Sequence, residues 1–235
     1  MRARILAVTW CAGLLAFHAL AATETAPPSP VHANGIDIAY QIMGADHRGT
    51  VLMISGAGMQ LTAWPPELCQ ALVKHGYRVI LFDNRDVGLS TKFDAAGAPD
   101  FAAVMQAAVA STPAPLPYTL YDMARDTIGL MDALSIRKAH VVGVSMGGII
   151  AQIVAAKFPE HTLSLTSMMA GDGKPGLPII AKPERMAQIP PSGPDSDRKA
   201  YFARQVAVWH AIGSPAYPPD DATLTAWIER DMARL

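Results

Sequence analysis

One serine of this chain stands in a residue pattern that favours nucleophilic chemistry. Residues 143–147 read Gly143-Val144-Ser145-Met146-Gly147, with a glycine two positions to either side of Ser145. A serine on a sharp turn between a strand and a helix needs such neighbours, because a side chain at Gly143 or Gly147 would collide with adjoining backbone. Held on that turn, the Ser145 hydroxyl could attack a carbonyl carbon while a histidine takes its proton and a carboxylate orients the histidine.

The flanking residues predict the strand and the helix that this turn requires. Residues 139–144 are a short apolar run rich in β-branched side chains, which is typical of a buried parallel strand. Residues 149–158 indicate a buried helix that stops before Pro159, and the helix is expected to begin at Met146. Strand, serine turn and helix therefore follow one another in the order that a nucleophile needs.

Predicted strands and helices alternate along the chain. We expect strands at residues 36–43, 51–55, 78–82 and 162–169, and helices at residues 66–75 and 118–134. This alternation indicates an α/β domain with a mostly parallel sheet and helices on both faces. After Gly171 the chain is rich in proline and glycine and then helical, at about residues 197–212 and 221–235, which predicts a helical lid.

The chain divides into four predicted parts. Residues 1–21 have the features of a secretory signal peptide, since two arginines precede an apolar stretch and cleavage can follow Ala21 or Ala22. An uncleaved membrane anchor is the alternative, but the apolar stretch is short for a span. A secreted or periplasmic protein is therefore expected. The other parts are a Pro-rich linker at residues 22–34, a core at residues 35–174 and an incomplete lid at residues 175–235.

Composition narrows the classes of partner and cofactor. The chain has 235 residues, 51% of them hydrophobic and 17% charged, with a formal net charge of −1. These values favour one domain with a sizeable core and, without a basic run, argue against nucleic acid as a partner. No metal or nucleotide motif is present in the sequence, so no cofactor is expected. Twelve methionines against six phenylalanines fit either core filling or a pliable apolar pocket.

Four segments together resemble the α/β-hydrolase family. Gly56-Ala57-Gly58 follows the third strand, and residues 83–90 resemble the D-x-R-G-x-G-x-S stretch after the fourth. Residues 118–134 are similar to the helix before the nucleophile, and residues 143–148 to the nucleophile elbow itself. The likeness covers about residues 33–235 and is greatest to small-ester hydrolases of the aclacinomycin methylesterase group.

Two positions depart from the family pattern. Asp86 stands where a glycine is common, which would alter only the local turn. Gly56-Ala57 stands where many members have His-Gly, so the position of the loop's oxyanion donor is less well defined.

The resemblance implies a reaction and assigns residues to it. It implies an exported serine hydrolase of a small carboxylic ester, acting through an acyl-enzyme on Ser145. The backbone N–H groups of Ala57 and Met146 would bind the oxyanion. In the family order, the catalytic acid follows the seventh strand and the histidine follows the eighth.

The catalytic acid and the histidine that this reaction requires are not recognisable in the chain. Neither the seventh nor the eighth strand is found before Leu235, so the expectation is a C-terminally truncated hydrolase with little or no activity. Asp172, after the sixth strand, is a less favoured candidate for the acid. His140 begins the strand before the nucleophile, at its far end, and His210 lies on a predicted lid helix. Neither histidine is a good candidate for the base.

Two further hypotheses stay open. A non-catalytic protein that binds a small ligand on the same scaffold would account for the missing base, although the intact elbow argues against it. A cofactor-free perhydrolase would use the same serine as the esterase. In each case a small molecule is the expected partner, with no stable membrane partner once the signal is removed.

Overall fold

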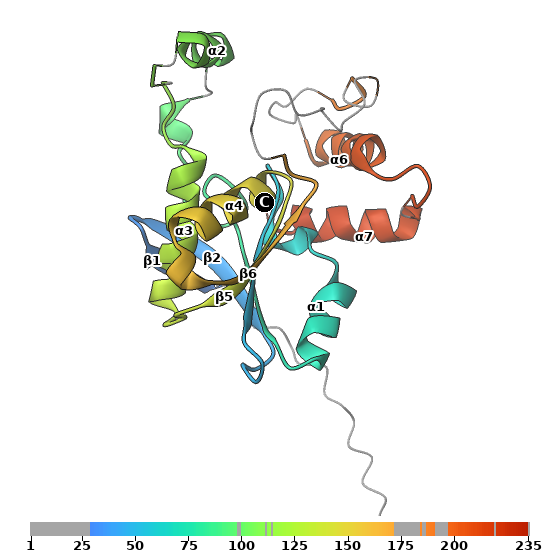
Figure 1. The fold of residues 1–235 in the computed structure, drawn as a ribbon. Coiled ribbons are helices and arrows are strands. Elements are labelled where there is room, and N and C mark those ends of the chain that lie inside the picture. The colour runs from blue at the N-terminus through green and yellow to red at the C-terminus, as the bar shows by residue number, and fades with distance from the viewer. Residues whose placement is uncertain are drawn as a thin grey trace, which may run out of the picture.

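The described part of the chain is built around one six-stranded sheet (Figure 1). A computed structural model describes residues 29–97, 100–110, 112–113, 115–171, 184, 187–190, 197–218 and 220–234. The strands are β1 (Ser29–Ala33), β2 (Ile36–Met43), β3 (Thr50–Ile54), β4 (Arg78–Phe82), β5 (Ala139–Val144) and β6 (Thr162–Met168). Their order across the sheet is β1-β2-β4-β3-β5-β6. β2 runs antiparallel to β1 and β4, and β3 to β6 run parallel, so the predicted mostly parallel sheet is confirmed.

The predicted linker is wrong at its C-terminal end. Ser29–Ala33, inside the expected linker at residues 22–34, form β1 and pair with β2. The turn between the two strands has Asn34 at φ 48° and Gly35 at φ 78°. Two consecutive left-handed residues make the tight hairpin turn that Asn-Gly favours, and this turn folds the end of the linker back onto the sheet.

Helices cover both faces of the sheet (Figure 1). On one face lie α3 (Leu120–Ala133) and α4 (Met146–Lys157), whose apolar sides enclose the larger core with β3, β4 and β5. On the other face α1 (Pro66–Lys74) covers a smaller core that includes Trp64 and the buried thiol of Cys69. The helices predicted at residues 66–75 and 118–134 are confirmed, one or two residues shorter at their ends.

Two helices after the sheet form a unit with its own apolar cluster. α6 (Arg198–Ile212) and α7 (Asp221–Met232) each begin after an aspartate whose carboxylate accepts a backbone N–H of the first turn. Leu224, Ile228 and Met232 of α7 are buried against aromatic side chains of α6. The predicted helices at residues 197–212 and 221–235 are confirmed, and none of the described helices is long and apolar enough to cross a membrane.

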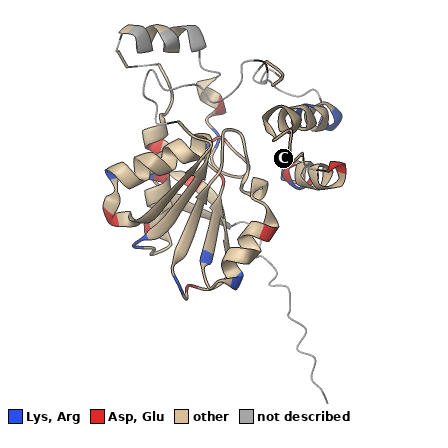
Figure 2. Cartoon of the chain, turned by 45° about the vertical axis from the view of Figure 1, so that its right-hand side comes forward, with Lys and Arg blue, Asp and Glu red and all other residues tan. Residues whose placement is uncertain are grey.

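The remaining short elements connect these layers. Sequence analysis missed α2 (Phe101–Ala110), because its apolar and small residues show no helical periodicity. α2 stands away from the sheet at the top of Figure 1. The 3₁₀ turns are η1 (Leu61–Ala63), η2 (Asp94–Ala96) and η3 (Pro159–His161). Charged residues are scattered over the helices and loops of the described chain, and the central strands carry few of them (Figure 2).

Candidate active site

Ser145 lies on a tight turn between β5 and α4, at the edge where the parallel strands end. Its backbone has φ 55° and ψ −123°, a region that costs a non-glycine residue about 1–3 kcal/mol. The Ser145 amide donates a hydrogen bond to the Met168 carbonyl at 2.8 Å. The Ser145 carbonyl accepts from the Gly148 amide at 2.9 Å and from the Ile149 amide at 3.2 Å. These bonds hold the strained turn, and the residue is exposed to solvent.

Close backbone packing requires both glycines that flank Ser145. A Cβ atom at Gly143 would lie 2.1 Å from the carbonyl oxygen of Gly147. One at Gly147 would lie 2.2 Å from the carbonyl oxygen of Ile54. No side-chain rotation can relieve these clashes, because the neighbouring atoms are backbone. The spacing of the motif thus follows from packing the start of α4 against the ends of β5 and β3.

The loop after β3 passes directly beside the serine. A Cβ atom at Gly56 would lie 3.4 Å from the Cβ atom of Ser145. Ala57, the next residue, is exposed, and α4 begins at Met146 with first-turn N–H groups that have no partner inside the helix. The positive end of the α4 dipole therefore lies at Ser145. The fold brings the two predicted oxyanion donors, Ala57 and Met146, to the same edge of the sheet.

Asp83 at the end of β4 joins two loops of this edge. Its side chain is fully buried and accepts hydrogen bonds from the Leu61 amide at 2.7 Å and the Leu89 amide at 3.0 Å. A Cβ atom at Gly88 would lie 2.3 Å from the Asp83 carboxylate, so this glycine leaves room for it. The Ser90 hydroxyl donates to the Asp83 carbonyl at 2.7 Å. Asp83 and Ser90 therefore hold the loop that follows β4.

Arg85 fixes the same loop to α3. Its Nε and Nη2 atoms donate to the two carboxylate oxygens of Asp126 at 2.6 and 2.7 Å, and the Asn34 side chain donates to Asp126 at 2.7 Å. The guanidinium also lies over the rings of Phe93 (5.2 Å) and Tyr118 (5.0 Å). Sequence analysis did not single out Asp126. An aspartate among the apolar residues of a predicted helix face was the signal that could have revealed it.

Asp86, which stands where the family pattern commonly has glycine, lies in a left-handed turn of the loop after β4. Asp86 has φ 65°, a conformation that glycine adopts without strain and aspartate tolerates. Its carboxylate accepts the Phe93 amide at 2.5 Å. Burial, together with a hydrogen bond to Asp86, raises the pKa of Tyr118 to about 12. The Asp86 carboxylate thus closes the turn through contacts with Phe93 and Tyr118 that a glycine could not make.

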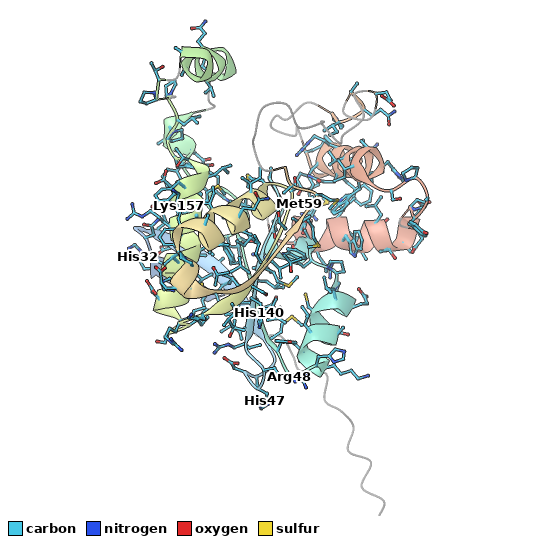
Figure 3. The ribbon with its side chains drawn as sticks, in the orientation of Figure 1. His32, His47, Arg48, Met59, His140 and Lys157 are labelled. Atoms are coloured by element: carbon cyan, nitrogen blue, oxygen red, sulfur yellow. The ribbon has the colours of Figure 1, made fainter. Side chains whose placement is uncertain are left out.

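No described histidine is hydrogen-bonded to Ser145. His140 lies at the amino end of β5, where it pairs with Val51 and contacts the Ser164 hydroxyl at 2.8 Å. Figure 3 places His140 and His47 at the end of the sheet opposite to Met59, which belongs to the loop beside Ser145. His210 is exposed on α6. The alternative acid Asp172 lies outside the described residues.

Eight of the described methionines form two groups, one in the core and one near the serine. Met53, Met123, Met131 and Met232 are buried core residues. Another group lies at or beside the turn that carries Ser145, and consists of Met59, Met146, Met168 and Met169. A Cβ atom at Gly56 would lie 3.1 Å from the Met59 sulfur, and Met169 is 83% exposed with φ 51°. Sequence analysis counted the methionines but did not place these four, because their proximity depends on three separate segments.

Metal ligands are not clustered in the part of the chain that the structure describes. It contains no group of three or more histidine, cysteine, aspartate or glutamate side chains arranged to bind an ion. Burial raises the pKa of the Cys69 thiol to about 11, so this cysteine is a protonated core residue.

Comparison with known proteins identifies the family. The profile described as alpha/beta hydrolase fold matches residues 49–208, which is more than half of the chain. The chain belongs to the alpha/beta hydrolase fold family. The segments that suggested the resemblance follow β3, β4 and β5 in the expected order.

Two relatives and one solved structure resemble this hydrolase-fold chain over different lengths. Rhodomycin D methylesterase DauP of Streptomyces sp. (strain C5) is 28% identical over 190 residues, covering 72% of this chain and 57% of DauP. Rhodomycin D methylesterase DnrP of Streptomyces peucetius is 34% identical over 121 residues, covering 52% of this chain and 35% of DnrP. The chain thus spans less than two thirds of either relative. A hydrolase from Pseudomonas aeruginosa PA01 superposes with a TM-score of 0.55 at 23% identity, over 91% of this chain and 67% of that one, which supports the fold.

Proposed function

We propose that this protein hydrolyses a small carboxylic ester through an acyl-enzyme on Ser145. The observation that carries the proposal is the strained turn at Ser145, which holds an exposed hydroxyl at the sheet edge beside the loop of Ala57. Strain of this kind persists where the surrounding structure enforces it, and it is concentrated at active sites. The names of the two methylesterase relatives support the choice of an ester.

The proposed reaction begins with attack of the Ser145 hydroxyl oxygen on the ester carbonyl carbon. A general base takes the hydroxyl proton, and the N–H groups of Met146 and Ala57 stabilise the negative charge on the carbonyl oxygen. The base returns this proton to the leaving oxygen as the tetrahedral intermediate collapses and releases the alcohol, and water then hydrolyses the acyl-serine to the carboxylic acid and free Ser145. We propose a substrate with an apolar acyl or alcohol group, because Met59 lies in the loop beside the serine and Met169 is an exposed, flexible side chain next to the residue whose carbonyl binds the Ser145 amide.

The general base is the part of the mechanism that the described residues do not supply. We propose that it lies outside them, since the described histidines at His140 and His47 are at the opposite end of the sheet. A Ser145 hydroxyl without a base is a weak nucleophile, although binding and the oxyanion donors can leave residual catalysis. We also propose that the protein is exported, from the signal-like residues 1–21.

A fluorophosphonate probe tests the proposal, because it forms a covalent bond with an activated serine. The protein isolated from its source, the 235-residue chain and a Ser145→Ala variant of each are incubated with the probe, and intact and peptide masses are measured. The expected result is modification of the Ser145 peptide in the protein from its source and none in Ser145→Ala. Slower labelling of the 235-residue chain would agree with a base that lies outside these 235 residues, and equal labelling with a base inside them.

Labelling combined with calorimetry tests the principal alternative, a non-catalytic binding protein. The lack of a described histidine at Ser145 favours this alternative. Binding of a small ester, detected by calorimetry, without labelling or turnover in the protein from its source would establish the binding role and refute the hydrolase. If labelling occurs, the products formed from the ester are compared with and without hydrogen peroxide. Formation of the acid alone indicates an esterase, and formation of the peracid in hydrogen peroxide indicates a perhydrolase.

A further inference from the structure

The end of α7 contacts the chain just after the loop of Ala57. The Gln60 side-chain amide donates to the Asp231 carbonyl at 2.9 Å, and the Arg230 guanidinium donates to the Thr62 carbonyl at 3.2 Å. The Thr62 hydroxyl also donates to the Asp231 carboxylate. Residues about 170 positions apart in the sequence are thus joined by hydrogen bonds of both backbone and side chain.

A second contact ties the end of α7 to the sheet. Arg234, in the turn that follows the helix, donates through Nη2 to the carboxylate of Asp83, which is fully buried. The same carboxylate accepts the Leu61 amide at 2.7 Å. Asp83 therefore connects the end of α7 to η1, and the Arg234 side chain is only 11% exposed.

The segment that α7 contacts continues into the loop that borders the serine. The Ser55 hydroxyl donates to the Gln60 carbonyl at 3.3 Å, and the Met59 amide donates to the Gly56 carbonyl at 3.2 Å. These two bonds close residues 55–60 into a compact turn. Ala57 lies inside this turn, so its N–H direction depends on where residues 60–62 are held.

These polar contacts join α7 to the part of the described chain that lies outside α6. The apolar residues of α7, namely Leu224, Ile228 and Met232, are buried against α6 in a cluster separate from the two sheet cores. An open groove lined by Pro66, Glu67 and Trp227, among others, separates α7 from the start of α1. A helix attached in this way can move as a unit with α6 when the polar contacts break.

Some buried hydrogen-bonding atoms at the attachment of α7 lack partners among the described residues. The buried Nε and Nη1 atoms of Arg234 and the buried Oε1 atom of Gln60 have no hydrogen-bond partner among the described residues. Burial raises the pKa of Asp231, while Thr62 and Arg230 oppose the rise, so its charge is costly at this position. Unpaired buried polar atoms destabilise the docked arrangement relative to a solvated one. These unpaired atoms and the buried Asp231 charge therefore oppose the docked position.

We propose that α7 positions the oxyanion loop, with Asp231 and Arg234 as positioning residues that act through Thr62 and Asp83. Docked, α7 holds residues 55–61 so that the Ala57 N–H can face the carbonyl oxygen of a substrate bound at Ser145. Undocked, the loop loosens and the donor is misaligned. The catalytic consequence of this coupling between α7 and residues 55–61 rests on the proposed function, but the coupling itself is a property of the fold.

Hydrogen–deuterium exchange of residues 55–61 measures the coupling without requiring turnover. The test variants are Thr62→Val, which removes the hydroxyl at nearly constant shape, and Arg234→Met. The matched controls are Thr62→Ser, which keeps the hydroxyl, and Glu229→Gln, an exposed change on the same helix. We expect loop amides to exchange about tenfold faster or more in Thr62→Val and Arg234→Met, as the loss of a charge-assisted hydrogen bond predicts. Both controls should exchange as the unsubstituted protein does.

The pattern of exchange decides between positioning and general destabilisation. Faster exchange confined to residues 55–61 and α7, with β5 and α3 unchanged, supports the proposal. Unchanged exchange in the loop, or an equal increase in β5 and α3, refutes it. In the enzyme from its source, Thr62→Val should lower kcat more than it raises KM, and Thr62→Ser should restore kcat. If the unsubstituted protein from its source is not labelled by fluorophosphonate, the hydrolase proposal fails. The exchange result still shows whether α7 and the loop are coupled.

Discussion

Breaking the buried ion pair between Arg85 and Asp126 is expected to destabilise the fold strongly. The two side chains are 7% and 3% exposed and share two hydrogen bonds of 2.6 and 2.7 Å. In Asp126→Leu the guanidinium of Arg85 stays buried without its counter-charge. Loss of one partner of such a pair costs about 3–5 kcal/mol, a large share of the roughly 5–15 kcal/mol that stabilises a typical domain. For a domain of this size, the melting temperature should fall by about 6–20 °C.

Urea unfolding followed by circular dichroism measures this cost, and a double variant shows its origin. Arg85→Met combined with Asp126→Leu removes both charges, so we expect it to be more stable than Asp126→Leu alone, with a coupling energy of about 2 kcal/mol or more. The control is His32→Gln, which removes a hydrogen bond to Asp37 between side chains that are 72% and 64% exposed and should cost less than about 1 kcal/mol. A cost below about 1 kcal/mol for Asp126→Leu, or strictly additive single costs, would refute the reasoning.

Three further predictions concern the nucleophile turn and the smaller core. Gly147→Ala should destabilise the fold by about 3 kcal/mol or more in urea, because its Cβ would lie 2.2 Å from the Ile54 carbonyl oxygen. Gly97→Ala, with φ 70° and open space, should cost only about 1–2 kcal/mol, and equal costs would contradict the clash. Ser145→Gly should be more stable than Ser145→Ala by about 1 kcal/mol, since glycine relieves the strain at φ 55°, and a less stable glycine variant would show that no strain is stored. The Cys69 pKa of about 11, against 9.0 for a free thiol, means that the unfolded thiol ionises first as the pH rises. Stability should therefore fall between about pH 9 and pH 11, and the Cys69→Ala variant should lack that part of the fall.

The elbow and most of the sheet were predictable because their signals are local. Alternation identified the strand at residues 36–43, and apolar runs identified those at 78–82 and 139–144, each with its observed bounds. β1 was missed because its alternating run is short and contains Pro30, and only pairing with β2 makes it a strand. The Asn34-Gly35 turn was the local signal that was overlooked.

The contacts that support the candidate site were not predictable from the sequence. Arg85 and Asp126 are 41 residues apart, and Asp83 and Arg234 are 151 apart. A charged residue on a predicted helix is ordinarily solvated, and the apolar neighbours of Asp126 could at most have indicated burial, not its partner. The same holds for the methionines at Ser145, which come from three segments.

The sequence by itself predicted the nucleophile turn, since Gly143, Ser145 and Gly147 form one local pattern, although the backbone that requires Gly147 belongs to Ile54 of β3. It also determined the alternation of strands and helices, because hydrophobic periodicity is a local property. Only the tertiary structure decided which polar groups surround that turn: the Asp126 carboxylate on Arg85, and the end of α7 on residues 60–62. Burial and long-range pairing set the energy of a charge, and both arise only when distant segments pack together.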